Sequence, residues 1–167
     1  MPNLRHDATL GVAGELERLQ LEARTWEAES EVMLDRVGVQ SAWSCVDLGC
    51  GAMGILGPLS RRVGHSGRVI GIDVQRRQLA AARLYLAREG LANVRLRAGD
   101  PCQTELPRAS FDLVHARFLF GLEVRHNQLL DEMLALVRPG GVIAIQEPDA
   151  SSWHCFPPRQ ALSLIHI

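Results

Sequence analysis

The sequence predicts one α/β domain built on a doubly wound, mostly parallel sheet. Two observations predict this fold class. Short apolar runs alternate with longer segments of helical periodicity, in the order β-α-β-α-β-β-α-β behind a leading helix. A glycine-rich stretch, residues 45–54, joins the first apolar run to a helix. That is the layout of a ligand-binding loop at the carboxyl end of a parallel strand.

The leading helix is predicted from an apolar stripe at three- to four-residue spacing over residues 14–37, with Gly38 as its C-terminal cap. Residues 1–13 show no periodicity and are expected to be loose. Trp26 lies in the stripe and is interpreted as a packing residue, or as a residue that overhangs a ligand together with Gln20.

The remaining elements follow from periodicity and from glycine or proline at their ends. Helices are expected over 56–63, 75–89 and 129–137, and strands over 45–48, 68–73, 94–98, 111–116 and 142–146. The strand at 94–98 alternates apolar and polar residues, which predicts a half-exposed edge strand. The strand at 142–146 is apolar on both faces, which predicts a central position behind a loop at 138–141.

Composition excludes several classes of function. The chain has 167 residues, is 47% hydrophobic and 22% charged, and has a formal net charge of −1, as in ordinary soluble proteins. It has no apolar run of membrane-spanning length and no apolar stretch of signal-peptide type at its start. Its Arg pairs are isolated, so no nucleic-acid footprint is expected. A cytoplasmic protein is predicted.

The cysteines have no C-x-x-C pair and no zinc-site spacing, so no metal site is expected. All four are predicted to be reduced and structural: Cys45, Cys50, Cys102 and Cys155.

The glycine-rich stretch admits two ligands. Gly49, Gly51 and Gly54 form G-x-G-x-x-G, and Asp73 follows about 20 residues later, as in a dinucleotide fingerprint. Asp47 favours the other ligand, because a carboxylate suits a cation better than a pyrophosphate. A zwitterionic amino acid with a sulfonium centre would place its ammonium near Asp47 and its carboxylate near the amides of the loop.

Five ordered stretches resemble the motifs of the class I S-adenosylmethionine-dependent methyltransferases. They are Asp47-Leu-Gly-Cys-Gly, Gly71-Ile-Asp73, Gly99-Asp100, Phe111-Asp-Leu-Val and Leu136-Val-Arg-Pro-Gly-Gly-Val142. The resemblance covers residues 14–150 and is nearest to the small-molecule enzymes related to quinone-biosynthesis methyltransferases. It implies a Rossmann-like methyltransferase fold, methyl transfer from S-adenosylmethionine and a small-molecule acceptor.

The resemblance also implies roles for single residues. The methionine part of the cofactor would be held by Asp47, Gly49, Cys50 and Gly51. Asp73 would accept hydrogen bonds from the ribose hydroxyls, and Asp100 would take the adenine amino group with Pro101 beside the ring. Either acid can instead be a turn residue. Met53 departs from the family's small third position, and its side chain either points away from the ligand or loosens its fit.

His115 is the candidate catalytic base, because imidazole titrates near neutral pH and the residue ends a strand. The alternative is a His that is only hydrogen-bonded there. Arg117 binds an acidic acceptor or pairs with Glu147. Oligomeric state is left open. Two other functions compete with methyl transfer: an NAD-dependent oxidoreductase, and an inactive cofactor-binding fragment.

The family's sheet has seven strands, and this sequence supplies the first five. We therefore expect a C-terminally truncated chain whose fifth strand, without its neighbours, is an exposed apolar edge. Expressed alone, such a chain should be poorly soluble and should transfer methyl groups weakly or not at all. The stretch Leu162–Ile167 resembles the translation of a sequencing-library adaptor, so residues 151–167 are interpreted as a non-native tail. The alternative is the start of a further helix.

Overall fold

The computed structural model describes residues 21, 23–121 and 125–149. The predictions of a loose start, of a helix beginning at residue 14, of Gln20 over a ligand, of Cys155 as a structural thiol and of a non-native tail lie outside these residues. The described strands are β1 (Ser44–Leu48), β2 (Arg68–Asp73), β3 (Val94–Ala98), β4 (Phe111–Arg117) and β5 (Val137–Gln146). The helices are α2 (Glu27–Val37), α3 (Leu56–Val63), α4 (Arg76–Arg88) and α5 (His126–Leu136).

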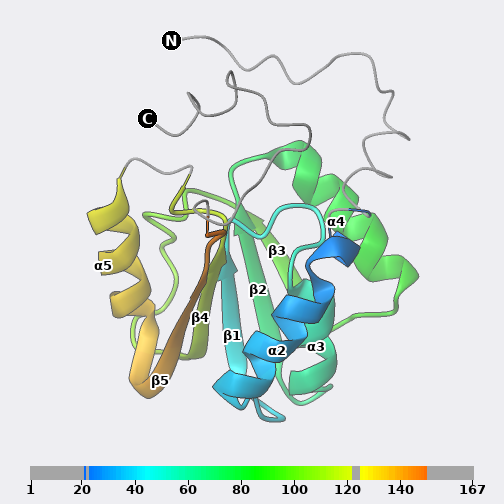
Figure 1. The fold of residues 1–167 in the computed structure, drawn as a ribbon, viewed down its shortest axis with the longest axis horizontal. Coiled ribbons are helices and arrows are strands. Elements are labelled where there is room, and N and C mark those ends of the chain that lie inside the picture. The colour runs from blue at the N-terminus through cyan, green and yellow to red at the C-terminus, as the bar shows by residue number, and fades with distance from the viewer. Residues whose placement is uncertain (1–20, 22, 122–124, 150–167) are drawn as a thin grey trace, which may run out of the picture.

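The strands form one parallel sheet in the order β3-β2-β1-β4-β5 (Figure 1). Helices α2, α3 and α4 contribute to the core on one face, and α5 packs on the other, as the residues of the two hydrophobic clusters show. The doubly wound parallel sheet is therefore confirmed. Because β1 lies in the middle, all five of its residues are buried.

One edge of the sheet agrees with the sequence prediction and the other does not. β3 is an edge strand with Arg95 and Arg97 exposed, as its alternation predicts. The central position that the apolar faces of β5 predict is wrong for the described residues, where β5 pairs with β4 alone. With Ile145 45% exposed, β5 is instead the exposed apolar edge expected for a sheet of five strands. β5 also begins at Val137, so residues 138–141 belong to the strand. A register shift opposite Phe111 and a positive φ at Gly140 accommodate the turn expected there.

The leading helix is broken where an unbroken helix was predicted. The chain turns at Trp26, and α2 begins at Glu27. Tertiary packing explains the break, because the Trp26 ring packs edge-to-face against Phe118, with 5.0 Å between ring centroids. Gly38 ends α2 with φ of 69°, which confirms the predicted cap. No described helix is long and apolar enough to cross a membrane.

Candidate cofactor site

The glycine loop leaves β1 at the carboxyl edge of the sheet and is tied to the end of β2. Gly49, Gly51 and Gly54 all have positive φ, at 70°, 60° and 40°, which explains why glycine occupies these positions. The amides of Gly49 and Cys50 both donate to the carbonyl oxygen of Ile72, at 2.8 and 3.0 Å. The loop is therefore held by β2 as well as by its own conformation.

Asp73 at the end of β2 is buried and also supports this loop. Its Oδ2 accepts from the amide of Gly51 at 2.9 Å, and its Oδ1 accepts from the amide of Gln75 at 2.7 Å. Asp73 thus makes the turn contact that was its alternative role. Each carboxylate oxygen accepts one of these bonds and keeps a second lone pair, so ligand binding is compatible with this geometry.

These bonds correct one expectation about the loop. The amides of Gly49, Cys50 and Gly51 already donate to the end of β2. The sequence predicts that these amides bind a ligand carboxylate, but in the structure they are already engaged and are not available for it. The physical reason is that β1 and β2 are adjacent and in register, so the loop amides meet the polar groups that end β2.

Asp47 faces His115 across the β1–β4 pair. The Nδ1 atom of His115 lies 2.7 Å from Oδ1 of Asp47, and its Nε2 lies 3.1 Å from Oε1 of Gln146 on β5. His115 is 0% exposed and Asp47 is 2% exposed. The candidate base is therefore enclosed, with both ring nitrogens engaged, as in the alternative of a hydrogen-bonded histidine.

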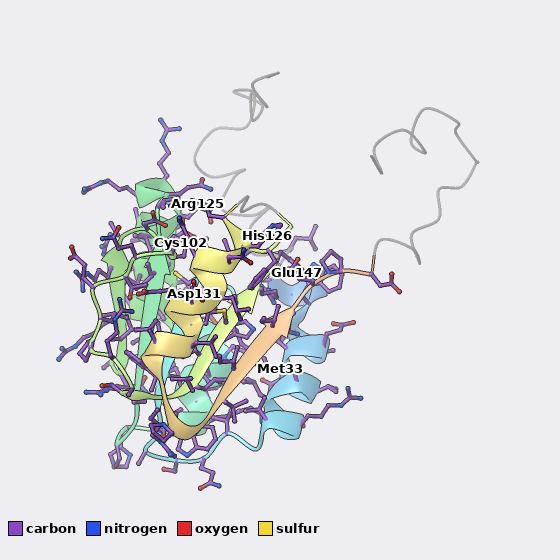
Figure 2. All side chains as sticks on the ribbon, turned by 90° about the vertical axis from the view of Figure 1, so that its left-hand side faces the viewer. Met33, Cys102, Arg125, His126, Asp131 and Glu147 are labelled. Carbon is purple, nitrogen blue, oxygen red and sulfur yellow. The ribbon has the colours of Figure 1, made fainter. Side chains whose placement is uncertain are left out.

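Asp100 lies in a tight turn after β3. Its Oδ1 accepts from the amide of Cys102 at 2.9 Å, next to the buried ring of Pro101. Arg125 lies at the start of α5 (Figure 2), and its guanidinium donates two hydrogen bonds to the same carboxylate, at 2.8 Å to Oδ2 and 3.1 Å to Oδ1. The bidentate pair joins the loop after β3 to the loop after β4.

Cys50 turns its side chain into the core. Its thiol is buried, and burial, with added repulsion from Asp47 and Asp73, raises the pKa of Cys50 well above its ordinary value. Only the backbone of Cys50 is therefore placed to serve a ligand. Burial likewise raises the pKa of Cys45 to about 12, and the three described cysteines are free thiols, as predicted.

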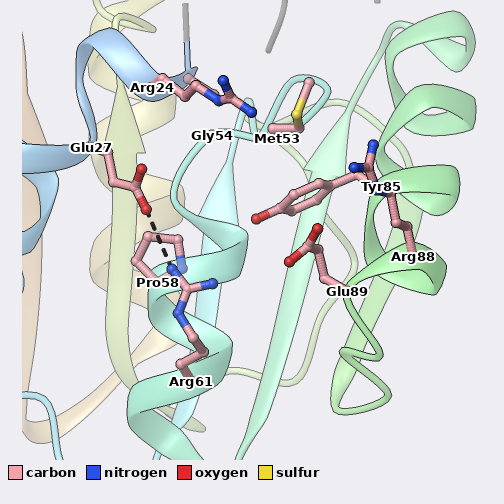
Figure 3. Close-up of a pocket in the computed structure, with 10 residues that line it drawn as sticks. Arg24, Glu27, Met53, Gly54, Pro58, Arg61, Tyr85, Arg88 and Glu89 are labelled. Atoms are coloured by element: carbon pink, nitrogen blue, oxygen red, sulfur yellow. Dashed lines mark hydrogen bonds and ion pairs between the residues drawn. The ribbon is translucent and has the colours of Figure 1, made fainter. Parts of the chain in front are cut away.

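Met53, the departure from the family pattern, lines a pocket of about 210 Å³. Figure 3 shows this pocket between the glycine loop and the helical segments that bear Arg24, Arg61 and Tyr85. None of the three predicted cofactor carboxylates lines it. Met53 is itself 5% exposed, so its bulk is absorbed by packing.

Sequence reasoning missed two residues at this edge of the sheet. A Cβ built on Gly49 would lie 3.0 Å from the Leu119 side chain, and one on Gly51 would lie 3.0 Å from Oε1 of Gln78. Leu119 and Gln78 therefore rest directly against the loop where its backbone is bare. Neither belongs to a motif or a periodic pattern that separates it from an ordinary loop or helix residue.

Known proteins match this arrangement. A sequence model of the family described as "Methyltransferase domain" matches residues 45–141. The chain is 33% identical over 116 residues to nocamycin O-methyltransferase of Saccharothrix syringae, covering 70% of this chain and 41% of that protein. It is 30% identical over 117 residues to demethylmenaquinone methyltransferase of Geobacillus sp. (strain WCH70), covering 70% of this chain and 50% of that protein.

A solved structure agrees. A SAM-dependent methyltransferase from Aquifex aeolicus superposes with a TM-score of 0.71 and 26% identity, over 82% of this chain and 72% of that one. This chain spans half or less of the length of the two curated relatives. With the family's sequence model matched across the sheet and the fold shared with a solved methyltransferase, the chain belongs to the methyltransferase domain family.

Proposed function

We propose that this chain binds S-adenosylmethionine at the carboxyl ends of β1, β2 and β3 and serves methyl transfer to a small-molecule acceptor. The observation that carries the proposal is the placement of Asp47, Asp73 and Asp100. Asp47 lies one residue before the end of β1, Asp73 ends β2, and Asp100 follows β3. The glycine loop follows β1, and its Gly51 amide donates to Asp73.

The residues fit the cofactor on two counts. Oδ2 of Asp47 accepts no hydrogen bond from the described residues, and no side-chain oxygen among them is both buried and without a partner, so Oδ2 is accessible and suited to accept from the ligand's ammonium. Gly49 and Gly51 add no side chain to the loop, and the flexible side chains of Leu119 and Gln78 that lie against them would line the ligand. Asp73 would serve the ribose hydroxyls, and Asp100 with Pro101 the adenine. Cys50 would contribute through its backbone carbonyl, because its amide already donates to Ile72.

The bound cofactor supplies an electrophilic methyl group, so the protein's task is positioning and the exclusion of water. The partly buried side chains of Leu119 and Phe120 follow β4 beside the loop and would shield this edge. His115 is enclosed within the sheet and does not reach an acceptor in this arrangement. We therefore propose no general base, and we assign His115 a supporting role below.

The acceptor is proposed only as a small molecule. The matched relatives are named for different ones, including nocamycin and trans-aconitate. Arg117 donates to the hydroxyl of Ser30 on α2 at 3.0 Å, which favours a role in holding α2 over an ion pair with Glu147. A reducing, cytoplasmic setting is proposed because the three described cysteines are buried free thiols.

Isothermal titration calorimetry with S-adenosylmethionine, S-adenosylhomocysteine and NAD tests the proposal. We expect S-adenosylmethionine and S-adenosylhomocysteine to bind and NAD to give no binding heat, because the chain belongs to a methyltransferase family and not to an oxidoreductase family. Asp73→Ala should weaken binding at least about tenfold. Asp131→Asn, an exposed acid on α5, is the matched control and should leave binding unchanged.

Two outcomes separate the alternatives. Binding of NAD without S-adenosylhomocysteine would overturn the proposal. Binding of S-adenosylmethionine with no S-adenosylhomocysteine produced from a mixed set of acidic and quinol acceptors would favour the inactive cofactor-binding fragment.

A further inference from the structure

Three polar side chains form a row near the carboxyl ends of three adjacent strands. Asp47 on β1 is the register partner of His115 on β4, and Gln146 lies on the neighbouring strand β5. The row is continuous, with 2.7 Å from Asp47 Oδ1 to His115 Nδ1 and 3.1 Å from His115 Nε2 to Gln146 Oε1. Because Asp47 and His115 are 2% and 0% exposed, water does not compete for the bond between them.

The chemistry of the pair fixes which atom donates. An ionised carboxylate only accepts, so the hydrogen bond at 2.7 Å requires a proton on Nδ1 of His115. Gln146 can meet Nε2 with either end of its amide, and it holds the ring from the other side. The imidazole is thereby clamped between two strands, with its donor directed at Asp47.

This contact leaves the two oxygens of Asp47 in different situations. Oδ1 is taken by His115, whereas Oδ2 has no hydrogen-bond partner among the described residues. Oδ2 lies 3.4 Å from the Cβ position built on Gly54, so it faces the glycine loop at a residue without a side chain. The oxygen directed at the proposed ligand site is therefore the one that His115 leaves available.

We propose that His115 is a positioning residue for the amino-acid part of the ligand. By donating to Oδ1, it fixes the Asp47 carboxylate so that Oδ2 is presented to the ligand's ammonium, and Gln146 keeps the ring in that orientation. The inference rests on the proposed function, because it takes the ligand to be an S-adenosyl amino acid. In this role His115 orients the Asp47 carboxylate and does not transfer a proton.

Two ligands and three variants test this role. S-adenosylhomocysteine carries the ammonium and methylthioadenosine lacks the amino-acid part, so only the first depends on Asp47. His115→Asn keeps a donor near the position of Nδ1, whereas His115→Gln keeps one near Nε2, and His115→Phe keeps the ring shape without donors. Calorimetry measures affinity, and urea unfolding checks that each variant is folded.

For His115→Phe and His115→Gln we expect S-adenosylhomocysteine to bind about tenfold more weakly, the worth of one charge-assisted hydrogen bond. Methylthioadenosine should bind these variants as it binds the original chain. His115→Asn should recover most of the lost affinity. If His115→Phe does not fold, the comparison of Asn with Gln still decides the question.

A parallel loss of both ligands in the variants would overturn the inference, because it would indicate a purely structural histidine. Equal affinities of the Asn and Gln variants for S-adenosylhomocysteine would overturn it as well. If the original chain binds neither ligand, the proposed function fails and this inference fails with it.

Discussion

Replacing Gly54 by alanine tests how tightly the glycine loop is defined. Gly54 has φ of 40°, and an added Cβ would lie 2.6 Å from the carbonyl oxygen of Cys50, a backbone atom that cannot rotate away. The left-handed backbone costs a side chain about 1–2 kcal/mol. Relief of the overlap adds about 1–3 kcal/mol. Gly90→Ala is the matched control, since Gly90 has φ of 68° and nothing within 4 Å of the added Cβ.

Urea unfolding and calorimetry measure the two consequences. We expect Gly90→Ala to lose only the backbone cost and to bind S-adenosylhomocysteine normally. Gly54→Ala should lose more stability, and its affinity should fall more than about tenfold, or 1.4 kcal/mol, because the loop must shift where it adjoins Asp47. Equal stability of the two variants, with unchanged binding by Gly54→Ala, would refute this description of the loop.

Two further predictions concern buried or bridging ion pairs. Burial raises the pKa of Glu132, but bonds from Thr104 and Arg108 outweigh it and lower that pKa. The stabilisation that this carboxylate contributes is therefore fully present above its unfolded pKa and is lost as the pH falls through its folded pKa. Glu132→Gln should lower the free energy of unfolding by about 2–3 kcal/mol at pH 7 and reduce its dependence on pH in the acid range. An unchanged dependence of unfolding free energy on pH would contradict this reasoning. Arg125→Gln should weaken S-adenosylhomocysteine binding about threefold, because it removes the two bonds that help to orient the Asp100 carboxylate. Asp100→Asn should then add little, and additive losses in calorimetry would mean that the two residues act independently.

The sheet and its glycine loop were predictable from local patterns. Apolar alternation identified β3 as an edge strand, and the run of glycines after Asp47 located the loop. These features follow from side-chain periodicity and from backbone sterics, which act within a few residues. The position of β5 was not predictable from its apolar faces, because burial of a strand depends on which segments pair beside it.

The sequence by itself determined that Asp47 and Asp73 end adjacent parallel strands and that glycine is required between them, because strand order follows from general rules of chain connection. Only the tertiary structure decided what each acid contacts. His115 meets Asp47 across 68 residues of chain, and Arg125 meets Asp100 across 25. No local pattern specifies such pairs, since they form only where folding brings two strand ends or two loops to the same edge of the sheet.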